Sequence, residues 1–124
     1  RRYKELLRLR LSALHGCKFC NQSNREDARA AGLSEAEINA LDNPNSGALS
    51  AQDRAVLALA ERLSLVTNQG AVDAELHARL ATFFDDAQIL ELGFVGSVLS
   101  GVAKFLFSFD LVEREENCPF HPAA

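Results

Sequence analysis

Apolar residues recur every three or four positions in each long segment of this chain, and this spacing constrains the fold more than any other feature. In the first segment, Tyr3, Leu7, Leu11 and Leu14 fall on one side of a helix. A half-buried strand would instead alternate apolar and polar residues. Because no segment shows that alternation, the sequence predicts an all-α protein.

Local start and stop signals divide the chain into about six helices. Gly16 and Gly32 end the first two, Ser34 and Glu37 form a capping box for the third, and Ser50 caps the fourth. The predicted helices cover residues 3–14, 17–31, 34–41, 50–66, 73–83 and 85–109, and a charged, irregular tail over 113–124 follows them. A turn at residues 68–70 ends the fourth helix.

Size and composition indicate a single domain over residues 1–124, because a chain of 124 residues can bury one core without disulfide staples. Hydrophobic residues make up 48% and charged residues 24%, which excludes a disordered chain. The net charge of −4 gives no electrostatic reason to expect nucleic acid or an anionic membrane as a partner. Residues 1–10 carry five basic side chains with no apolar run after them, so we expect no signal peptide and a cytoplasmic location.

The last predicted helix is apolar nearly all round. Its uncharged run of twelve residues, 92–103, is shorter than the ~18–20 that span a membrane, so we expect no membrane span. The expected core stripe is Val95, Val98, Val102, Phe105 and Phe109, and the small residues Gly93, Ser97 and Gly101 would let another helix approach closely. We therefore expect part core and part contact in a homo-oligomer; the alternative is a core helix of a monomer.

Cys17-Lys18-Phe19-Cys20 is the most informative motif. Directly after Gly16, both thiols would lie in the first turn of the second helix, where the helix dipole and Lys18 favour a thiolate. A spacing of three residues places the two sulfurs on one helix face, close enough for a disulfide. The pattern predicts redox or metal chemistry, and the alternative is two small buried side chains.

A carboxylate lies on the preceding helix. Glu5, Arg8, Ser12 and His15 form a polar stripe that ends beside Cys17. If the second helix folds back on the first, Glu5 can face the thiols and accept a proton, directly or through water. The alternative is a surface pair between Glu5 and Arg8.

Glu5, an eleven-residue gap and then Cys17-x-x-Cys20 resembles the alkylhydroperoxidase AhpD and carboxymuconolactone decarboxylase-like family. The resemblance extends to residues 5–12 and to the helix capped by Ser50. It implies an all-α AhpD-like bundle, homo-oligomers that are often trimers or hexamers, and antioxidant, peroxiredoxin-type reduction of a peroxide or disulfide. The resemblance also implies a proton relay through the carboxylate and a histidine four residues after the second cysteine.

The chain departs from that pattern at Asn24, which occupies the histidine position. An amide cannot accept a proton at neutral pH, so the usual relay is missing. Phe19 also stands where some members carry a second histidine. His15 could replace the missing base; the alternative is a histidine that contacts the end of its own helix.

The resemblance implies a thiol-dependent oxidoreductase in which Cys20 attacks and Cys17 resolves, with Cys17 the more open to a reducing partner. Glu5 would accept the proton, and no dissociable cofactor is required. The expected partners are a peroxide or disulfide substrate and a thiol reductant protein.

Two alternatives remain. The loss of the histidine at Asn24 is compatible with a non-catalytic or weakly active oligomer that serves as a binding or assembly module. Cys17, Cys20, Cys118 and His121 could instead form a zinc site, although the two pairs lie far apart in sequence. His77 is expected at the surface.

Overall fold

A computed structural model describes residues 1–43, 45–67 and 72–121, and it confirms the all-α architecture of six helices. The elements are α1 (Arg2–His15), α2 (Lys18–Ala30), α3 (Glu35–Asn39), the 3-10 turn η1 (Ala40–Asp42), α4 (Ala51–Leu63), α5 (Ala74–Ala81) and α6 (Asp86–Ser108). The described residues contain no β-strand, and their one β-type pairing is an isolated antiparallel bridge between Cys17 and Arg114.

The caps lie where the sequence predicts them. Ser34 and Ser50 accept hydrogen bonds from the amides three residues ahead, and Gly16 ends α1 in a left-handed conformation with φ of 66°. The end of α4 is different: the helix stops at Leu63 rather than at residue 66. The Leu65 N–H donates to the imidazole of His15 instead of continuing the helix. The predicted turn at 68–70 lies outside the described residues.

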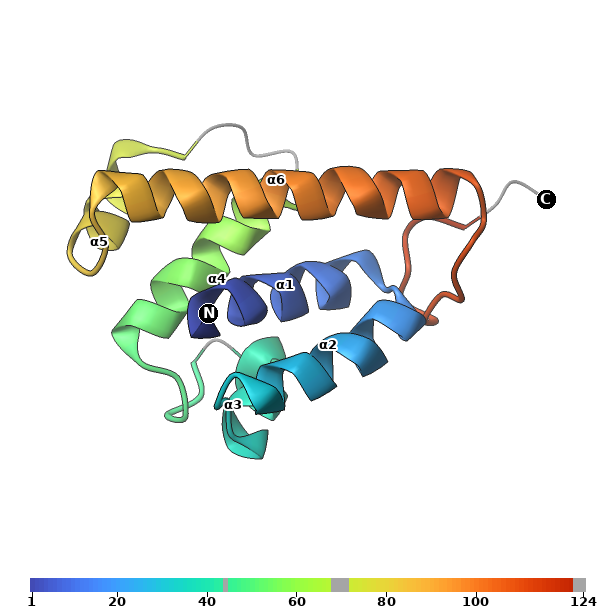
Figure 1. Ribbon diagram of the computed structural model, residues 1–124, viewed down its shortest axis with the longest axis horizontal. Coiled ribbons are helices and arrows are strands. Elements are labelled where there is room, and N and C mark those ends of the chain that lie inside the picture. Colours follow the sequence, from blue (N-terminus) through green and yellow to red (C-terminus); the bar gives the residue numbers. More distant parts are fainter. Residues whose placement is uncertain (44, 68–71, 122–124) are drawn as a thin grey trace.

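Helix α1 is central, and it packs against α2, α4 and α6. Figure 1 shows α6 running along one side of the molecule, with α1 and α4 beneath it and α2 and α3 farther out. Because α1 has neighbours on several sides, its buried residues extend beyond the single predicted stripe. The main buried apolar residues of α1 and α4 are Leu6, Leu7, Leu9, Leu11, Val56, Leu59 and Ala60.

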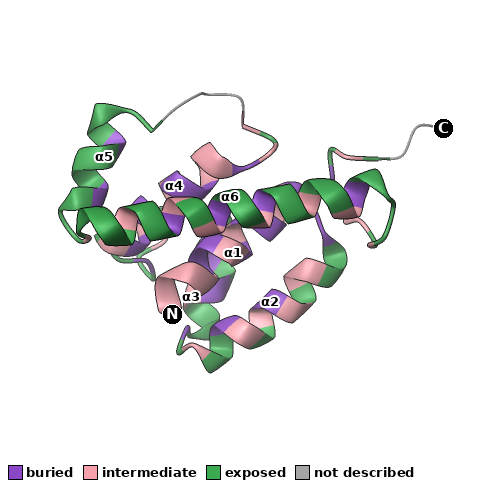
Figure 2. Cartoon of the chain, turned by 45° about the horizontal axis from the view of Figure 1, so that its top comes forward, coloured by how far each residue is buried: buried purple, intermediate pink, exposed green. Residues whose placement is uncertain are grey.

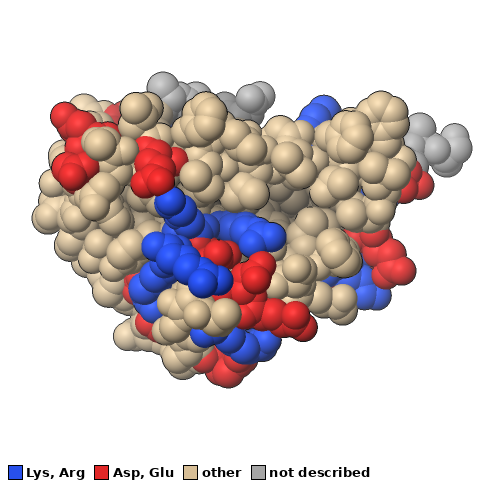
Figure 3. Space-filling model, viewed as in Figure 1, with Lys and Arg blue, Asp and Glu red and all other residues tan. Residues whose placement is uncertain are grey.

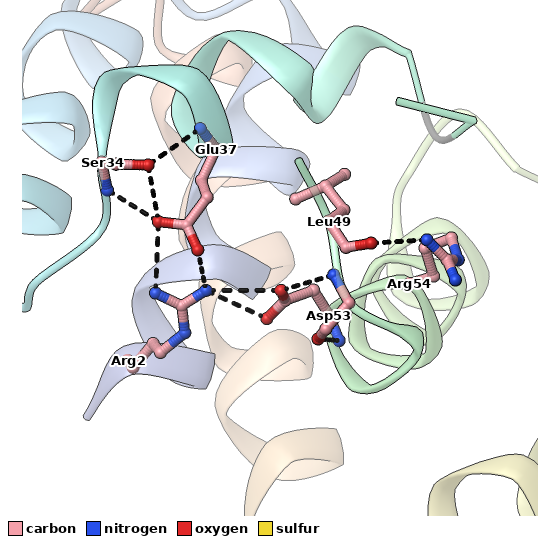
Figure 4. A network of polar contacts seen from close by, with 7 residues as sticks. Arg2, Ser34, Glu37, Leu49, Asp53 and Arg54 are labelled. Atoms are coloured by element: carbon pink, nitrogen blue, oxygen red, sulfur yellow. Dashed lines mark hydrogen bonds and ion pairs between the residues drawn. The ribbon is translucent and has the colours of Figure 1, made fainter. Parts of the chain in front are cut away.

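An ion network joins the starts of three helices (Figure 4). The Arg2 Nη2 atom lies 2.6 Å from Glu37 Oε1 and 3.2 Å from Asp53 Oδ1. Glu37 and Asp53 also complete the capping boxes of α3 and α4. The hydrogen bonds from Arg2 and from the Ser34 backbone lower the pKa of Glu37 to about 2. This network fixes how α1, α3 and α4 meet.

Helix α6 packs on the bundle through small residues. A Cβ on Gly96 would lie 2.4 Å from Leu63 Cδ1, and the Ser100 hydroxyl donates to the Leu63 carbonyl at 2.8 Å. The predicted core stripe is therefore wrong for most of its members, because Val98, Val102, Phe105 and Phe109 are exposed. Only Val95 of that stripe is packed against the core.

The outward face of α6 carries a continuous apolar stripe, seen as the exposed side of that helix in Figure 2. Its residues are Leu90, Phe94, Val98, Val102, Phe105 and Phe109, with exposed fractions from 48% to 74%. By length and composition alone, α6 could cross a membrane, and 17% of its most apolar window is buried in this chain. An exposed apolar stripe of this kind is typical of an interaction surface.

Candidate functional site

The cysteine pair lies at the junction of α1 and α2. Cys17 is the N-cap of α2, and its Sγ accepts a hydrogen bond from the Cys20 N–H at 3.2 Å. The two sulfurs are bonded, with an S–S distance of 2.07 Å and a Cα–Cα distance of 5.2 Å. The sequence prediction that the pair begins the second helix and can form a disulfide is confirmed. An amide hydrogen bond to an N-cap sulfur favours the anionic over the neutral form of a thiol.

The two sulfurs differ in access. Cys17 is 1% exposed, whereas Cys20 is half-buried. The expectation that Cys17 is the more open to a partner is therefore wrong. The cause is the chain after α6, which folds back over the start of α2 and covers Cys17 (Figure 1).

This returning segment is bound through its backbone. The Lys18 N–H donates to the Glu113 carbonyl at 3.0 Å, and the Glu115 N–H donates to the Gly16 carbonyl at 2.8 Å. The guanidinium of Arg114 donates to the Phe107 carbonyl and lies over the Phe107 ring. The predicted irregular tail is thus bound to the start of α2 through Glu113 and Glu115.

A cavity of about 220 Å³ opens beside the disulfide, between α1, α2 and α6. Its polar lining comes from Arg8, Ser12, His15, Ser23 and Asn24, and its apolar lining includes Leu11, Phe19, Leu99, Val102, Ala103, Leu106 and Val112. Both cysteines line it. Phe19 is 63% exposed and also lines a neighbouring surface hollow with Leu106 and Val112. The site therefore offers a half-buried sulfur to a small molecule in largely apolar surroundings.

Asn24 lies in this cavity, one helical turn after Cys20, as the sequence spacing predicts. It is 4% exposed. Within the part of the chain that the structure describes, its side-chain amide has no hydrogen-bond partner. A bound molecule in the cavity could therefore use that amide as donor or acceptor.

His15 also lines the cavity, but its Nε2 lone pair already accepts a hydrogen bond. Its Nε2 accepts from the Leu65 N–H at 3.0 Å, and burial lowers the pKa of His15 to about 4. The ring is therefore neutral at pH 7, with its proton on Nδ1. His15 consequently cannot replace the missing base through Nε2, and its contact is with the chain after α4 rather than with the end of α1.

Glu5 is not among the residues that line the cavity. Its carboxylate lies 3.5 Å from Arg8 Nη1 and 4.0 Å from Arg1 Nε, and Arg8 donates in turn to Asp27 on α2 at 2.8 Å. Because Arg8 lines the cavity, Glu5 is connected to it through that guanidinium. The predicted pair between Glu5 and Arg8 is formed.

The remaining sequence candidates lie away from the cavity. The Lys18 ammonium faces Glu113 at 3.5 Å, so its charge is paired with the returning segment. His77 is exposed, as expected. The zinc alternative fails, because Cys17 and Cys20 are bonded to each other and no group of three potential metal ligands exists among the described residues.

Comparison with known proteins assigns this chain to a family. The sequence model of the Carboxymuconolactone decarboxylase family matches residues 1–62, the half of the chain that contains Glu5, both cysteines of the pair and Asn24. The chain belongs to the carboxymuconolactone decarboxylase family. The uncharacterized protein YdfG of Bacillus subtilis (strain 168) is 32% identical over 90 residues, which cover 72% of this chain. The chain spans 60% of the length of that relative.

A solved structure supports the same grouping. It is a protein of unknown function from Agrobacterium tumefaciens, named a candidate antioxidant defence protein AhpD. The superposition covers 99% of the present chain and 79% of the Agrobacterium chain. The TM-score is 0.79 and the sequence identity is 25%. The AhpD-like resemblance read from the sequence is therefore confirmed for the fold and the family.

Several parts of the site in this carboxymuconolactone decarboxylase family member were missed by sequence reasoning. Ser23 and the cavity-lining residues of α6 carry no motif, and they join the site only through packing. The covering segment at 113–118 reads as irregular because its hydrogen bonds go to residues about 100 positions away. The one available signal was the third cysteine, Cys118, which is buried in the same apolar cluster as Cys17.

Proposed function

We propose that this family member is a thiol-dependent oxidoreductase, of the antioxidant alkylhydroperoxidase type, that reduces a peroxide or a disulfide. The observation that carries the proposal is the Cys17–Cys20 disulfide on the wall of a largely apolar cavity. A structural disulfide would not need an adjoining cavity or a half-buried sulfur.

Cys20 is the attacking sulfur because it is the more accessible of the two. Its thiolate attacks the O–O bond of a hydroperoxide, so that Cys20 becomes a sulfenic acid and an alkoxide leaves, which takes up a proton to become an alcohol. The Cys17 thiol then attacks the sulfenic sulfur, the disulfide forms, and water leaves.

Reduction of the disulfide begins at the same sulfur. A thiolate of a reducing partner attacks Cys20, because Cys17 is buried beneath the returning segment. Cys17 leaves as a thiolate that the Cys20 N–H can stabilise at the N-cap, and a low thiol pKa speeds departure. A second thiol of the partner completes the reduction.

Proton transfer in this site differs from the pattern with a histidine. Asn24 can orient a peroxide by hydrogen bonding but cannot accept its proton. We propose Glu5 as the proton acceptor, reached through water rather than by direct contact, with its carboxylate held near the cavity by the guanidinium of Arg8. Such a path is slower than a positioned base, so the pair should be reactive but slow.

The test is thiol loss after addition of cumene hydroperoxide to the reduced protein. We expect the wild type to lose two thiols and to form the Cys17–Cys20 disulfide. Cys20→Ser should lose the fast reaction, whereas Cys17→Ser should still react with peroxide and accumulate a sulfenic acid. If Cys20→Ser reacts as fast as the wild type, the proposed attacking residue is wrong.

The exposed stripe of α6 favours a second element of function, assembly. We propose that copies of this chain form homo-oligomers, trimers or hexamers, through this stripe. The surface over most of α6 carries few charged side chains. The charged side chains of this view gather below α6, over α1 and α2 (Figure 3). If the thiol chemistry is absent, such an oligomer would act as a binding or assembly module.

Light scattering at micromolar concentration tests the assembly. Phe94→Glu places a charge within the stripe and should release monomers. Ala78→Glu, at an exposed position on α5, is the control and should not. A monomeric wild type would refute the proposal.

A further inference from the structure

A third sulfur lies beside the disulfide. Cys118 is a free thiol, 2% exposed, and it belongs to the same buried cluster as Cys17 and Phe107. Cys20 packs against that cluster from its edge. The chain contains three cysteines in all, and the fold brings them together although the third lies 98 positions after the second, 118 less 20.

The backbone holds Cys118 close to the pair. A Cβ on Gly16 would lie 2.6 Å from the Cys118 Cα and 2.7 Å from its Cβ, so these two residues are in direct contact. Since successive Cα atoms are ~3.8 Å apart, the Cα atoms of Cys17 and Cys118 are separated by at most about 8 Å. Disulfides join Cα atoms roughly 4.4–6.8 Å apart, so this upper bound lies within about 1 Å of the range of a disulfide.

We propose that Cys118 is a third redox-active thiol, which exchanges with the disulfide by attacking the sulfur of Cys17. The proposal rests on the proposed redox activity of the Cys17–Cys20 pair. In this step a Cys118–Cys17 bond forms, the Cys17–Cys20 bond breaks, and Cys20 leaves as a thiolate. Cys118 loses one proton and Cys20 gains one, and no outside oxidant or reductant takes part.

The two sulfurs of the disulfide thus have different neighbours. A molecule in the cavity meets Cys20, whereas Cys118 approaches from within the apolar cluster that contains Cys17. Burial keeps Cys118 away from thiols and oxidants in solution, so its accessible reaction partner is the disulfide beside it. Exchange would move the oxidised bond under the returning segment and restore a free Cys20 thiol in the cavity.

The first experiment compares two variants, each with one cysteine of the pair replaced by serine, so that two cysteines remain in each. Cys20→Ser retains Cys17 and Cys118, and Cys17→Ser retains Cys20 and Cys118. Each variant is brought to equilibrium in a glutathione redox buffer, where burial of the thiols affects the time needed but not the end point. We expect the equilibrium constant for the intramolecular disulfide to be at least about tenfold larger in Cys20→Ser, because Cys17 and Cys118 are both buried members of the cluster. Tryptic cleavage after Lys18 separates the cysteines of the motif, so mass spectrometry can identify each bond. Two free thiols persisting in Cys20→Ser, or equal equilibrium constants for both variants, would overturn the proposal.

The second experiment uses the oxidised wild type, with no peroxide and no substitution in the pair. The protein is held at pH 8, quenched in acid and labelled with N-ethylmaleimide. We expect label on Cys20 in the molecules that carry the Cys17–Cys118 bond, and no label on Cys20 in Cys118→Ala. Label confined to Cys118 would refute exchange. Because neither measurement depends on peroxide turnover, failure of the peroxidase proposal and failure of the exchange proposal are distinguishable.

Discussion

Gly16→Ala is the substitution for which the structure gives the most definite expectation. Gly16 has φ of 66°, a conformation that costs alanine about 1 kcal/mol relative to glycine. The new Cβ would also lie 2.6 Å from the Cα of Cys118, so the returning segment would have to move. That movement would break the hydrogen bonds of Glu115 to Gly16 and of Lys18 to Glu113, each worth about 1 kcal/mol. The sum is a loss of about 3 kcal/mol in the free energy of unfolding.

The chain supplies a matched control at Gly32. This residue also has a positive φ, 91°, but a Cβ there would meet nothing within 4 Å. Gly32→Ala should therefore lose only the conformational part, about 1 kcal/mol. The comparison separates backbone strain from the contact with the returning segment.

Urea denaturation of both variants measures the difference, and labelling of Cys118 by a thiol reagent under native conditions reports the segment itself. We expect Gly16→Ala to be about 2 kcal/mol less stable than Gly32→Ala and to expose Cys118. If the two variants are equally stable and Cys118 stays protected in both, the segment does not depend on its contact with Gly16, and the reasoning is wrong.

Three further predictions concern the cavity and the pH dependence. Asn24→His should raise the rate of peroxide-dependent disulfide formation by about tenfold or more, measured by stopped-flow thiol oxidation at pH 7, and adding Glu5→Gln should remove most of that gain. An unchanged rate in folded Asn24→His would refute the assignment of that position. Burial lowers the pKa of His15 to about 4, so its neutral imidazole contributes fully to stability above pH ~6.5 and progressively less as the pH falls toward 4. Denaturation at several pH values should show the free energy of unfolding falling over this range, and His15→Gln should lack that fall. Glu37, with its pKa lowered to about 2, contributes stability above pH ~4.5 that is lost as the pH falls through 2; acid titration of Glu37→Gln should show a weaker loss, and an identical curve would contradict the role of the Arg2 network.

The starts of the helices could be predicted because their signals are local. Ser34, Ser50, Asp73 and Asp85 each accept a hydrogen bond from an amide three residues away, so a short window of sequence contains both partners. The disulfide was predictable for the same reason, since the two cysteines are one helical turn apart. Local chemistry determined these features.

The sequence predictions were wrong where residues far away in the sequence determine the local structure. The end of α4 depends on His15, 50 residues earlier, which takes the amide of Leu65. Helix α6 is apolar on both sides, so periodicity alone could not tell that Gly96 and Ser100 face the bundle while Phe94 and Phe105 face outward. For Glu5 the spacing within α1 left two positions open, facing the thiols or paired with Arg8, and the pair with Arg8 is the one formed.

The segment that covers Cys17 also has a consequence for the order of folding. The hydrogen bond between Asn21 and Glu115 spans 94 residues, and the backbone bonds beside it span similar distances. Contacts of such high sequence separation have a large loop-closure cost, so they form late unless the intervening structure has already brought the ends together. During synthesis, α1 and α2 therefore emerge with both cysteines uncovered, and residues 113–118 can cover Cys17 only after α6 has been made. The surroundings of the cysteine pair would thus be the last part of the chain to close, and the pair would be most open to mispairing before they do.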